Sequence, residues 1–181
     1  PDIEVRIDAS SQIVDLEGEG IDVGIRYGTG RYPGLKVDRL FAEEVSPVCG
    51  PALLKGKRGL REPDDLRWHT LLHAGWSTPS GVIPDWRMWL RAAHVEGVDW
   101  TKGPSYGDYY LALQAAIEGQ GVALASPIVV ATDLAAGRLA QPFKLAVSGG
   151  FAYYVVTPKG AAGAPKVAAF RDWLIEESGE N

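Results

Sequence analysis

Cysteine and methionine are nearly absent from this chain of 181 residues, which has one Cys, at position 49, and one Met. A single cysteine excludes an internal disulfide framework and fits a reducing compartment. We expect Cys49 to be a small buried apolar residue rather than a sensor thiol. No apolar run approaches the roughly 20 residues that a membrane-spanning helix needs, and no signal peptide is visible. These absences favour a cytoplasmic protein that does not enter a membrane.

Positive charge is also scarce, with 18 Lys and Arg against 23 Asp and Glu and a formal net charge of -5. Contacts to nucleic-acid phosphates need a basic surface, and the chain has no run of Lys or Arg. We therefore expect it to be a poor nucleic-acid binder by itself. Its 46% hydrophobic content is enough for one good core or two small lobes.

The common signatures of enzymes and cofactor sites are missing. His69 and His73 lack both an H-E-x-x-H context and a cysteine pair, so they do not predict a zinc site. The chain has no G-x-S-x-G elbow and no P-loop, and its Gly-x-Gly pairs lack the third glycine of a dinucleotide site. We expect no enzyme, no catalytic residue, no metal and no cofactor.

Strand and helix signals alternate along the chain with short connections. Apolar patterning predicts strands over residues 3–8, 21–27, 35–48, 70–73, 102–106, 122–125 and 151–157. Caps, prolines and apolar spacing predict helices at residues 12–18, from 51, from 63, at 86–93, 109–118 and 127–137, and from 165. This alternation predicts an α/β fold with mostly parallel sheets. No linker separates sequential domains, so any second lobe must be inserted into the first.

Ordered motifs extend over nearly the whole chain. The first group is Asp15-Leu16, Gly20 to Gly28, Gly30 and Tyr32-Pro33-Gly34. The later groups are Pro47-Val48-Cys49, Pro51 to Leu54, Asp65-Leu66, Leu71-Leu72-His73, Trp89-Leu90, Ala112 to Ala116, Gly119 to Leu124, Gly137-Arg138-Leu139 and Tyr153 to Val156. In this order they resemble the effector-binding (substrate-binding) domain of LysR-type transcriptional regulators, in particular the glycine-cleavage activator and beta-lactamase regulator subgroup.

The resemblance implies an α/β, type 2 periplasmic-binding-protein-like fold, in which two Rossmann-like lobes are joined by two crossover strands. Lobe I would comprise residues 1–45 and 152–181, and the inserted lobe II would comprise residues 46–151. Residues 35–48 and 149–157 would provide the crossovers.

Members of this family carry further segments before the part that matches Pro1. These are a DNA-binding winged helix, a linker helix, and the N-terminal strand and helix of lobe I, which are absent from this sequence. We therefore expect the natural protein to be longer. Since the missing strand lies between them in related folds, we also expect the strands at 3–8 and 21–27 not to be adjacent.

Ligands of open α/β sheets bind beyond the carboxyl ends of the strands, where helix N-termini converge and favour carboxylates. This rule, with the resemblance, predicts a ligand site in the cleft between the lobes. Its candidate effector-binding residues are Ser10, Ser11, Tyr27, Gly28, His73, Trp76, Tyr106, Ser126 and Tyr153. The mixture of hydroxyl and aromatic groups would suit a small polar metabolite.

Several of these residues have a purely structural alternative. Ser126 precedes Pro127, so it is equally a helix N-cap, and Asp108 is expected to cap a helix rather than contact a ligand. His73 is more often structural than ligand-binding at such a position. Trp86 and Trp89 stand at helical spacing and are expected in the core.

The resemblance implies the effector-sensing and oligomerising half of a bacterial DNA-binding regulator. Its expected effector is an amino acid, a cell-wall fragment or another carboxylate, and its expected assembly is a homodimer or tetramer. DNA would be bound only through a domain outside this chain. The alternative is an extracytoplasmic solute-binding protein of a transporter, which shares the fold.

Overall fold

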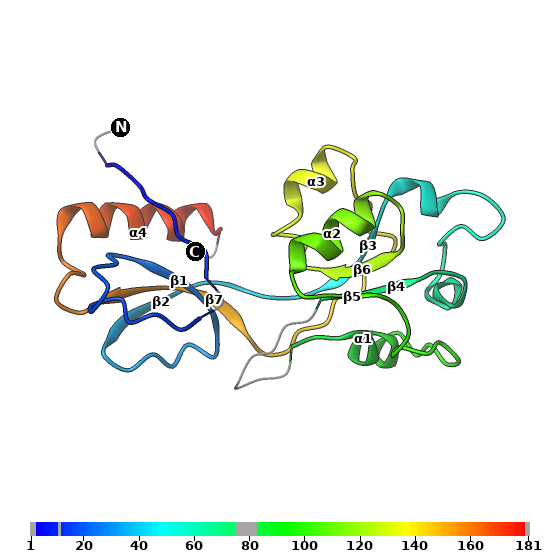
Figure 1. The fold of residues 1–181 in the computed structure, drawn as a ribbon, viewed down its shortest axis with the longest axis horizontal. Helices are drawn as coiled ribbons and strands as arrows, with labels where there is room; N and C mark the ends of the chain where they lie inside the picture. Colours follow the sequence, from blue (N-terminus) through cyan, green and yellow to red (C-terminus); the bar gives the residue numbers. More distant parts are fainter. Residues whose placement is uncertain (1–2, 11, 75–82, 180–181) are drawn as a thin grey trace. The chain divides into compact units, whose positions relative to one another are not determined.

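The computed structural model describes residues 3–10, 12–74 and 83–179. The chain divides into two compact units (Figure 1). Unit 1 comprises Pro1–Ala42 and Gly150–Asn181, and unit 2 comprises Glu43–Gly149. The sequence of unit 2 therefore lies between the two segments of unit 1.

Unit 1 contains a three-stranded sheet in the order β1-β7-β2, with β1 at Gly24–Gly28, β2 at Leu35–Ala42 and β7 at Ala152–Pro158. Both ladders are antiparallel, so the returning strand β7 pairs with β1 on one side and β2 on the other. Val155 and Val156 of β7 are fully buried, as expected for the central strand of a sheet.

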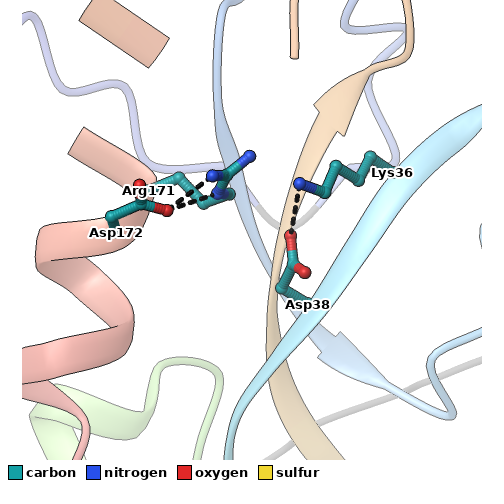
Figure 2. Close-up of polar contacts among 4 residues, drawn as sticks. All are labelled: Lys36, Asp38, Arg171 and Asp172. Carbon is teal, nitrogen blue, oxygen red and sulfur yellow. Dashed lines mark hydrogen bonds and ion pairs between the residues drawn. The ribbon is translucent and has the colours of Figure 1, made fainter. Parts of the chain in front are cut away.

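Helix α4, at Pro165–Glu177, lies alongside this sheet (Figure 1). Proline at its first turn suits helix initiation, and Val167 is the residue that it buries most completely. Figure 2 shows Arg171 and Asp172 of α4 near Lys36 and Asp38 of β2. The Arg171 guanidinium donates to the Asp172 carboxylate, and the Lys36 ammonium lies 4.0 Å from Asp38 Oδ2. Partly exposed pairs of this kind contribute little to stability, so the apolar contacts of α4 dominate.

Unit 2 contains a four-stranded sheet in the order β3-β6-β4-β5. Its strands are β3 at Ser46–Cys49, β4 at Leu71–Ala74, β5 at Ser105–Tyr106 and β6 at Val122–Ala125. Strand β4 is parallel to both β5 and β6, whereas β3 is antiparallel to β6. The carboxyl ends of β4, β5 and β6 therefore lie at the same edge as the start of β3.

Both faces of this sheet are buried, because consecutive strand residues point to opposite sides. Leu72 belongs to the core cluster that contains helix α2 at Tyr109–Ile117, with Val130 and Leu139. Leu71 belongs to the other cluster, with helix α1 at Trp86–Ala92 and the 3-10 helix η2 at Pro63–Trp68. The remaining helices are η1 at Pro51–Leu54 and α3 at Ala131–Ala135.

Cys49 is fully buried in β3, which confirms the prediction of a small buried apolar residue. Burial raises the pKa of its thiol to about 11. The thiol is therefore protonated and unreactive at neutral pH.

Three predictions about the N-terminal part of unit 1 are wrong. The expected strand over residues 3–8 does not form, and Ile7 is 86% exposed. The predicted separation of residues 3–8 from the next strand is not contradicted, because the described partner of β1 is β7. The expected helix over residues 12–18 is a turn at residues 16–20, closed by a bond from Ile21 N–H to the Leu16 carbonyl. Regular strand structure begins at Gly24 rather than at residue 21.

Other boundaries differ as well. The expected strand over residues 35–48 is two strands, β2 and β3, and the strand expected at 102–106 is reduced to β5. The expectation of mostly parallel sheets is wrong for unit 1, where both ladders are antiparallel. Helix α3 begins at Ala131, so Ser126 is not its N-cap. Within the described residues, no helix has the length and apolar character needed to cross a membrane.

Candidate functional site

A cavity of about 310 Å³ lies at the carboxyl edge of the unit 2 sheet. The described residues that line it all belong to unit 2: Glu43, Val45, Leu72, His73, Ala74, Ile83, Pro84, Asp85, Trp86, Tyr109, Ala112, Ala123 and Leu124. Its volume is at the lower end of the range for small-molecule sites, and its walls combine apolar side chains with polar groups.

The sheet brings these residues together. His73 and Ala74 end β4, Tyr109 begins the helix that follows β5, and Val45 precedes β3. Val45 is held there by reciprocal backbone hydrogen bonds of 2.9 Å with Val147. Because β3 runs antiparallel to β6, its start meets the ends of the parallel strands. This edge is the one at which open α/β sheets bind ligands.

The N-cap of helix α2 fixes the position of Tyr109, the first residue of that helix. Asp108 caps α2, and its carboxylate accepts a 2.7 Å hydrogen bond from the Tyr110 N–H. The phenol oxygen of Tyr109 accepts a hydrogen bond from the backbone N–H of Ser126, at 3.4 Å. Burial raises the pKa of Tyr109, and the nearby Glu43 carboxylate raises it further. The phenol is therefore neutral at physiological pH.

Ser126 follows β6 directly and is 1% exposed. Its hydroxyl is buried and has no hydrogen-bond partner. Ser46, whose neighbour in the ladder is Ala125 of β6, also has a buried hydroxyl without a partner. Orphaned buried hydroxyls are uncommon, because each one costs about 1–3 kcal/mol. Of the two, only Ser126 contacts a residue of the cavity lining, Tyr109, so its hydroxyl is the one placed for a ligand or for a second conformation.

The α1 side of the cavity is fixed by two hydrogen bonds. The indole N–H of Trp86 donates to the Leu72 carbonyl at 3.0 Å, and Asp85 accepts from the Met88 N–H at 2.8 Å as the cap of α1. His73 Nε2 lies 3.0 Å from the Lys102 carbonyl oxygen. A carbonyl oxygen can only accept, so this nitrogen of His73 carries a proton.

The charge of the lining is of one sign. Glu43, which is 6% exposed, and Asp85 supply carboxylates, and no Lys or Arg belongs to the described lining. Carboxylates in this lining favour a ligand that presents an ammonium or another hydrogen-bond donor. Within the described ranges, no group of His, Cys, Asp or Glu side chains is arranged to hold a metal ion.

Four predicted site residues belong to unit 2. His73 lines the cavity, and Ser126 lies next to it through its bond to Tyr109. Tyr106 packs against the core cluster on the α2 side and does not line the cavity. Trp76 lies outside the described residues.

The other five belong to unit 1. Tyr27 and Tyr153 are opposite each other in the β1–β7 ladder, with ring centroids 5.0 Å apart. Gly28 lies against the Tyr32 hydroxyl, and a Cβ there would be 2.6 Å from that oxygen. Ser10 is exposed, and its hydroxyl accepts a local hydrogen bond from the Gln12 N–H at 3.1 Å. Ser11 lies outside the described residues.

Sequence reasoning missed several lining residues. The sequence predicts Tyr109 only as a helix start, although its position directly after the cap Asp108 is a usable signal. Trp86 was assigned to the core, where it is indeed buried, but it also lines the cavity. Glu43 had no local signal, because its burial arises only when β3 joins the sheet.

Comparison with known proteins identifies the family. Residues 1–179 match the model of the LysR substrate binding domain. The chain belongs to the LysR substrate-binding domain family. This membership confirms the sequence-based assignment and, with the structural likeness described next, the periplasmic-binding-protein-like α/β fold.

Relatives of this LysR domain are regulators. It is 39% identical over 178 residues to the glycine cleavage system transcriptional activator of Escherichia coli K12, covering 98% of this chain and 56% of that protein. It is 34% identical to the HTH-type transcriptional activator AmpR of Providencia stuartii, covering 98% of this chain and 57% of the relative. The effector domain of AmpR from Pseudomonas aeruginosa superposes with a TM-score of 0.77 at 29% identity, covering 98% of this chain and 82% of that one.

The LysR domain thus spans about half the length of these two activators, 56% and 57%. Both are transcriptional activators and not solute-binding proteins of transporters, so the transporter alternative finds no support in them.

Proposed function

We propose that this LysR domain is the effector-sensing domain of a DNA-binding transcriptional regulator and binds a small metabolite in the unit 2 cavity. The observation that carries the proposal is the buried, unpaired Ser126 hydroxyl beside a cavity at the ligand-binding edge of the sheet. In this proposal, unit 1 corresponds to lobe I and unit 2 to the inserted lobe II.

The chemistry of the cavity favours a zwitterion. The Glu43 and Asp85 carboxylates suit an ammonium group, while the hydroxyl and backbone N–H of Ser126 suit a carboxylate oxygen. Leu72, Trp86 and Ala112 offer apolar contact for a short side chain. We therefore propose an amino acid, or a molecule that carries an amino-acid group, as the effector.

The remaining features of the proposal concern the whole protein. The LysR domain is acidic, with a net charge of -5, and is therefore poorly suited to bind DNA. We propose that a winged helix outside this chain binds the DNA. The whole protein acts in the cytoplasm as a homodimer or tetramer and is not an enzyme. Tyr27, Gly28 and Tyr153 of unit 1, with Ser10, Ser11, Trp76 and Tyr106, stay predictions for effector contact.

A thermal-shift screen tests the ligand class. Glycine, L-alanine and L-glutamate are each compared with a matched acid that lacks the amine, such as propionate for L-alanine, and a matched amine, such as ethylamine. An effector that binds only the folded state, at 100 times its Kd, stabilises by about 2.7 kcal/mol. We expect amino acids to raise Tm more than either control. Equal effects of propionate and L-alanine, or no effect of any amino acid, would contradict the proposal.

A further inference from the structure

Tyr109 connects Ser126 to the cavity. Tyr109 belongs to the cavity lining, whereas Ser126 is 1% exposed and does not. The contact between them is the hydrogen bond from the Ser126 N–H to the Tyr109 phenol oxygen, at 3.4 Å. The Ser126 hydroxyl beside this N–H has no partner. Ser126 thus has two adjacent donors: its N–H makes one long hydrogen bond, and its hydroxyl makes none.

We infer that Tyr109 is a gate that determines ligand specificity, because its phenol oxygen occupies the place at the Ser126 N–H that an acceptor oxygen of the ligand takes. This inference rests on the proposed function, since it assumes that the ligand enters this cavity. Binding then exchanges one acceptor for another: Tyr109 moves away, and a ligand oxygen accepts from the N–H and hydroxyl of Ser126.

The exchange selects for a charged acceptor. Burial raises the pKa of Tyr109, so its phenol is a neutral acceptor, and 3.4 Å is long for an N–H···O bond. A ligand carboxylate forms shorter, charge-assisted hydrogen bonds that are roughly twice as strong, and it can also satisfy the orphaned hydroxyl. A neutral ligand hydroxyl gains little over the phenol that it displaces. The gate therefore favours carboxylate-bearing ligands.

A ligand-free experiment tests the gate. In the variant Ser126→Cys, the new thiol is titrated with N-ethylmaleimide, with and without the further change Tyr109→Ala. We expect the thiol to react slowly while Tyr109 is present and at least about tenfold faster once it is removed. The natural thiol of Cys49, which is fully buried in β3, serves as an internal control for unfolding. Equal reactivity at position 126 with and without Tyr109, while Cys49 stays protected, would overturn the gate.

A second variant keeps the test decisive if Tyr109→Ala exposes Cys49. Tyr109→Phe removes the phenol oxygen and with it the acceptor of the Ser126 N–H bond, which then no longer competes with the ligand. We expect L-alanine and propionate, which share the carboxylate, both to bind Tyr109→Phe about threefold to tenfold more tightly than the unmodified domain, the value of one hydrogen bond. Unchanged or weaker binding would overturn the gate, since a phenol that contacts the ligand directly would lower affinity when removed.

The two ideas fail separately. If no amino acid binds the unmodified domain, the proposed function fails, but the thiol experiment still decides whether Tyr109 covers Ser126. If amino acids bind and Tyr109→Phe weakens them, the proposed function stands and the gate is wrong.

Discussion

Replacing Ser126 by alanine should stabilise the ligand-free domain, although most substitutions of buried residues destabilise. The reason is that the Ser126 hydroxyl is buried and makes no hydrogen bond, and that α3 begins too far along the chain for it to act as a cap. Burial of an unpaired hydroxyl costs about 1–3 kcal/mol. Part of this gain is lost with the packing of the oxygen atom, so we expect a net stabilisation of about 1 kcal/mol.

The measurement is urea unfolding at 25 °C together with a thermal scan. For a chain of this length, 1 kcal/mol corresponds to an increase of about 2–4 °C in Tm. Ser46→Ala is the matched control, because the Ser46 hydroxyl is also buried and unpaired, at 0% exposure. Both variants should be more stable than the unmodified domain, but only Ser126→Ala should weaken the binding of amino acids.

A loss of stability in Ser126→Ala would contradict this prediction. If Ser126→Ala lowers the free energy of unfolding by more than about 0.5 kcal/mol, the hydroxyl is satisfied in the ligand-free state and is not held in reserve for a ligand. If Ser46→Ala weakens ligand binding as strongly as Ser126→Ala, the effect is a general change in the sheet.

Three further predictions concern stability. Trp89→Phe should cost about 2–3 kcal/mol in urea unfolding, because it removes a fully buried indole and its 3.0 Å hydrogen bond to the Leu145 carbonyl; a cost below 1 kcal/mol would contradict the packing. Gly103→Ala should abolish stable folding, measured by circular dichroism, since its Cβ would lie 1.9 Å from the Leu71 carbonyl oxygen at a φ of 127°; a native Tm would contradict it. Two backbone N–H bonds lower the pKa of Asp65, so its stabilising effect is present above the pKa of the unfolded chain and is lost as pH falls through the lower folded pKa. Asp65→Asn should therefore be less stable than the unmodified domain at pH 7, by less than about 1 kcal/mol, and equally stable near pH 2; a difference that persists in acid would contradict the cause.

Local signals predicted the elements of unit 2 well. Asp108 before an apolar run and Gly119 after it placed α2 correctly, because cap and stop act within one helical turn. The short apolar run at residues 122–125 predicted β6 as observed, since a strand buried on both faces needs continuous apolar residues.

The structure of unit 1 was harder to predict, because it depends on pairing between strands that are far apart in the sequence. Ile3, Val5 and Ile7 alternate as a strand would, but alternation alone supplies no partner, and these residues are exposed. The antiparallel sheet of unit 1 depends on the return of β7 between β1 and β2, from more than 100 residues away, as the pairing of Gly24 with Val156 shows. Neither direction nor partner is encoded in a single strand.

The site was predicted only in part for the same reason. Strand direction predicts that His73 and Ser126 lie at the carboxyl edge, where His73 lines the cavity and Ser126 contacts Tyr109; their contact with an effector stays a prediction. The bond between Ser126 and Tyr109, and the burial of Glu43, arise only in the folded sheet and have no sequence signature.

The most direct test of the account is an NMR titration of the ¹⁵N-labelled domain with L-alanine. We predict that the largest amide shifts occur at the cavity edge, at Ser126, Tyr109 and His73, and that propionate produces a weaker response at the same amides. Shifts centred on the other end of β4, near Gly103, or no shift in unit 2 with any amino acid, would contradict the claim that this cavity senses the effector.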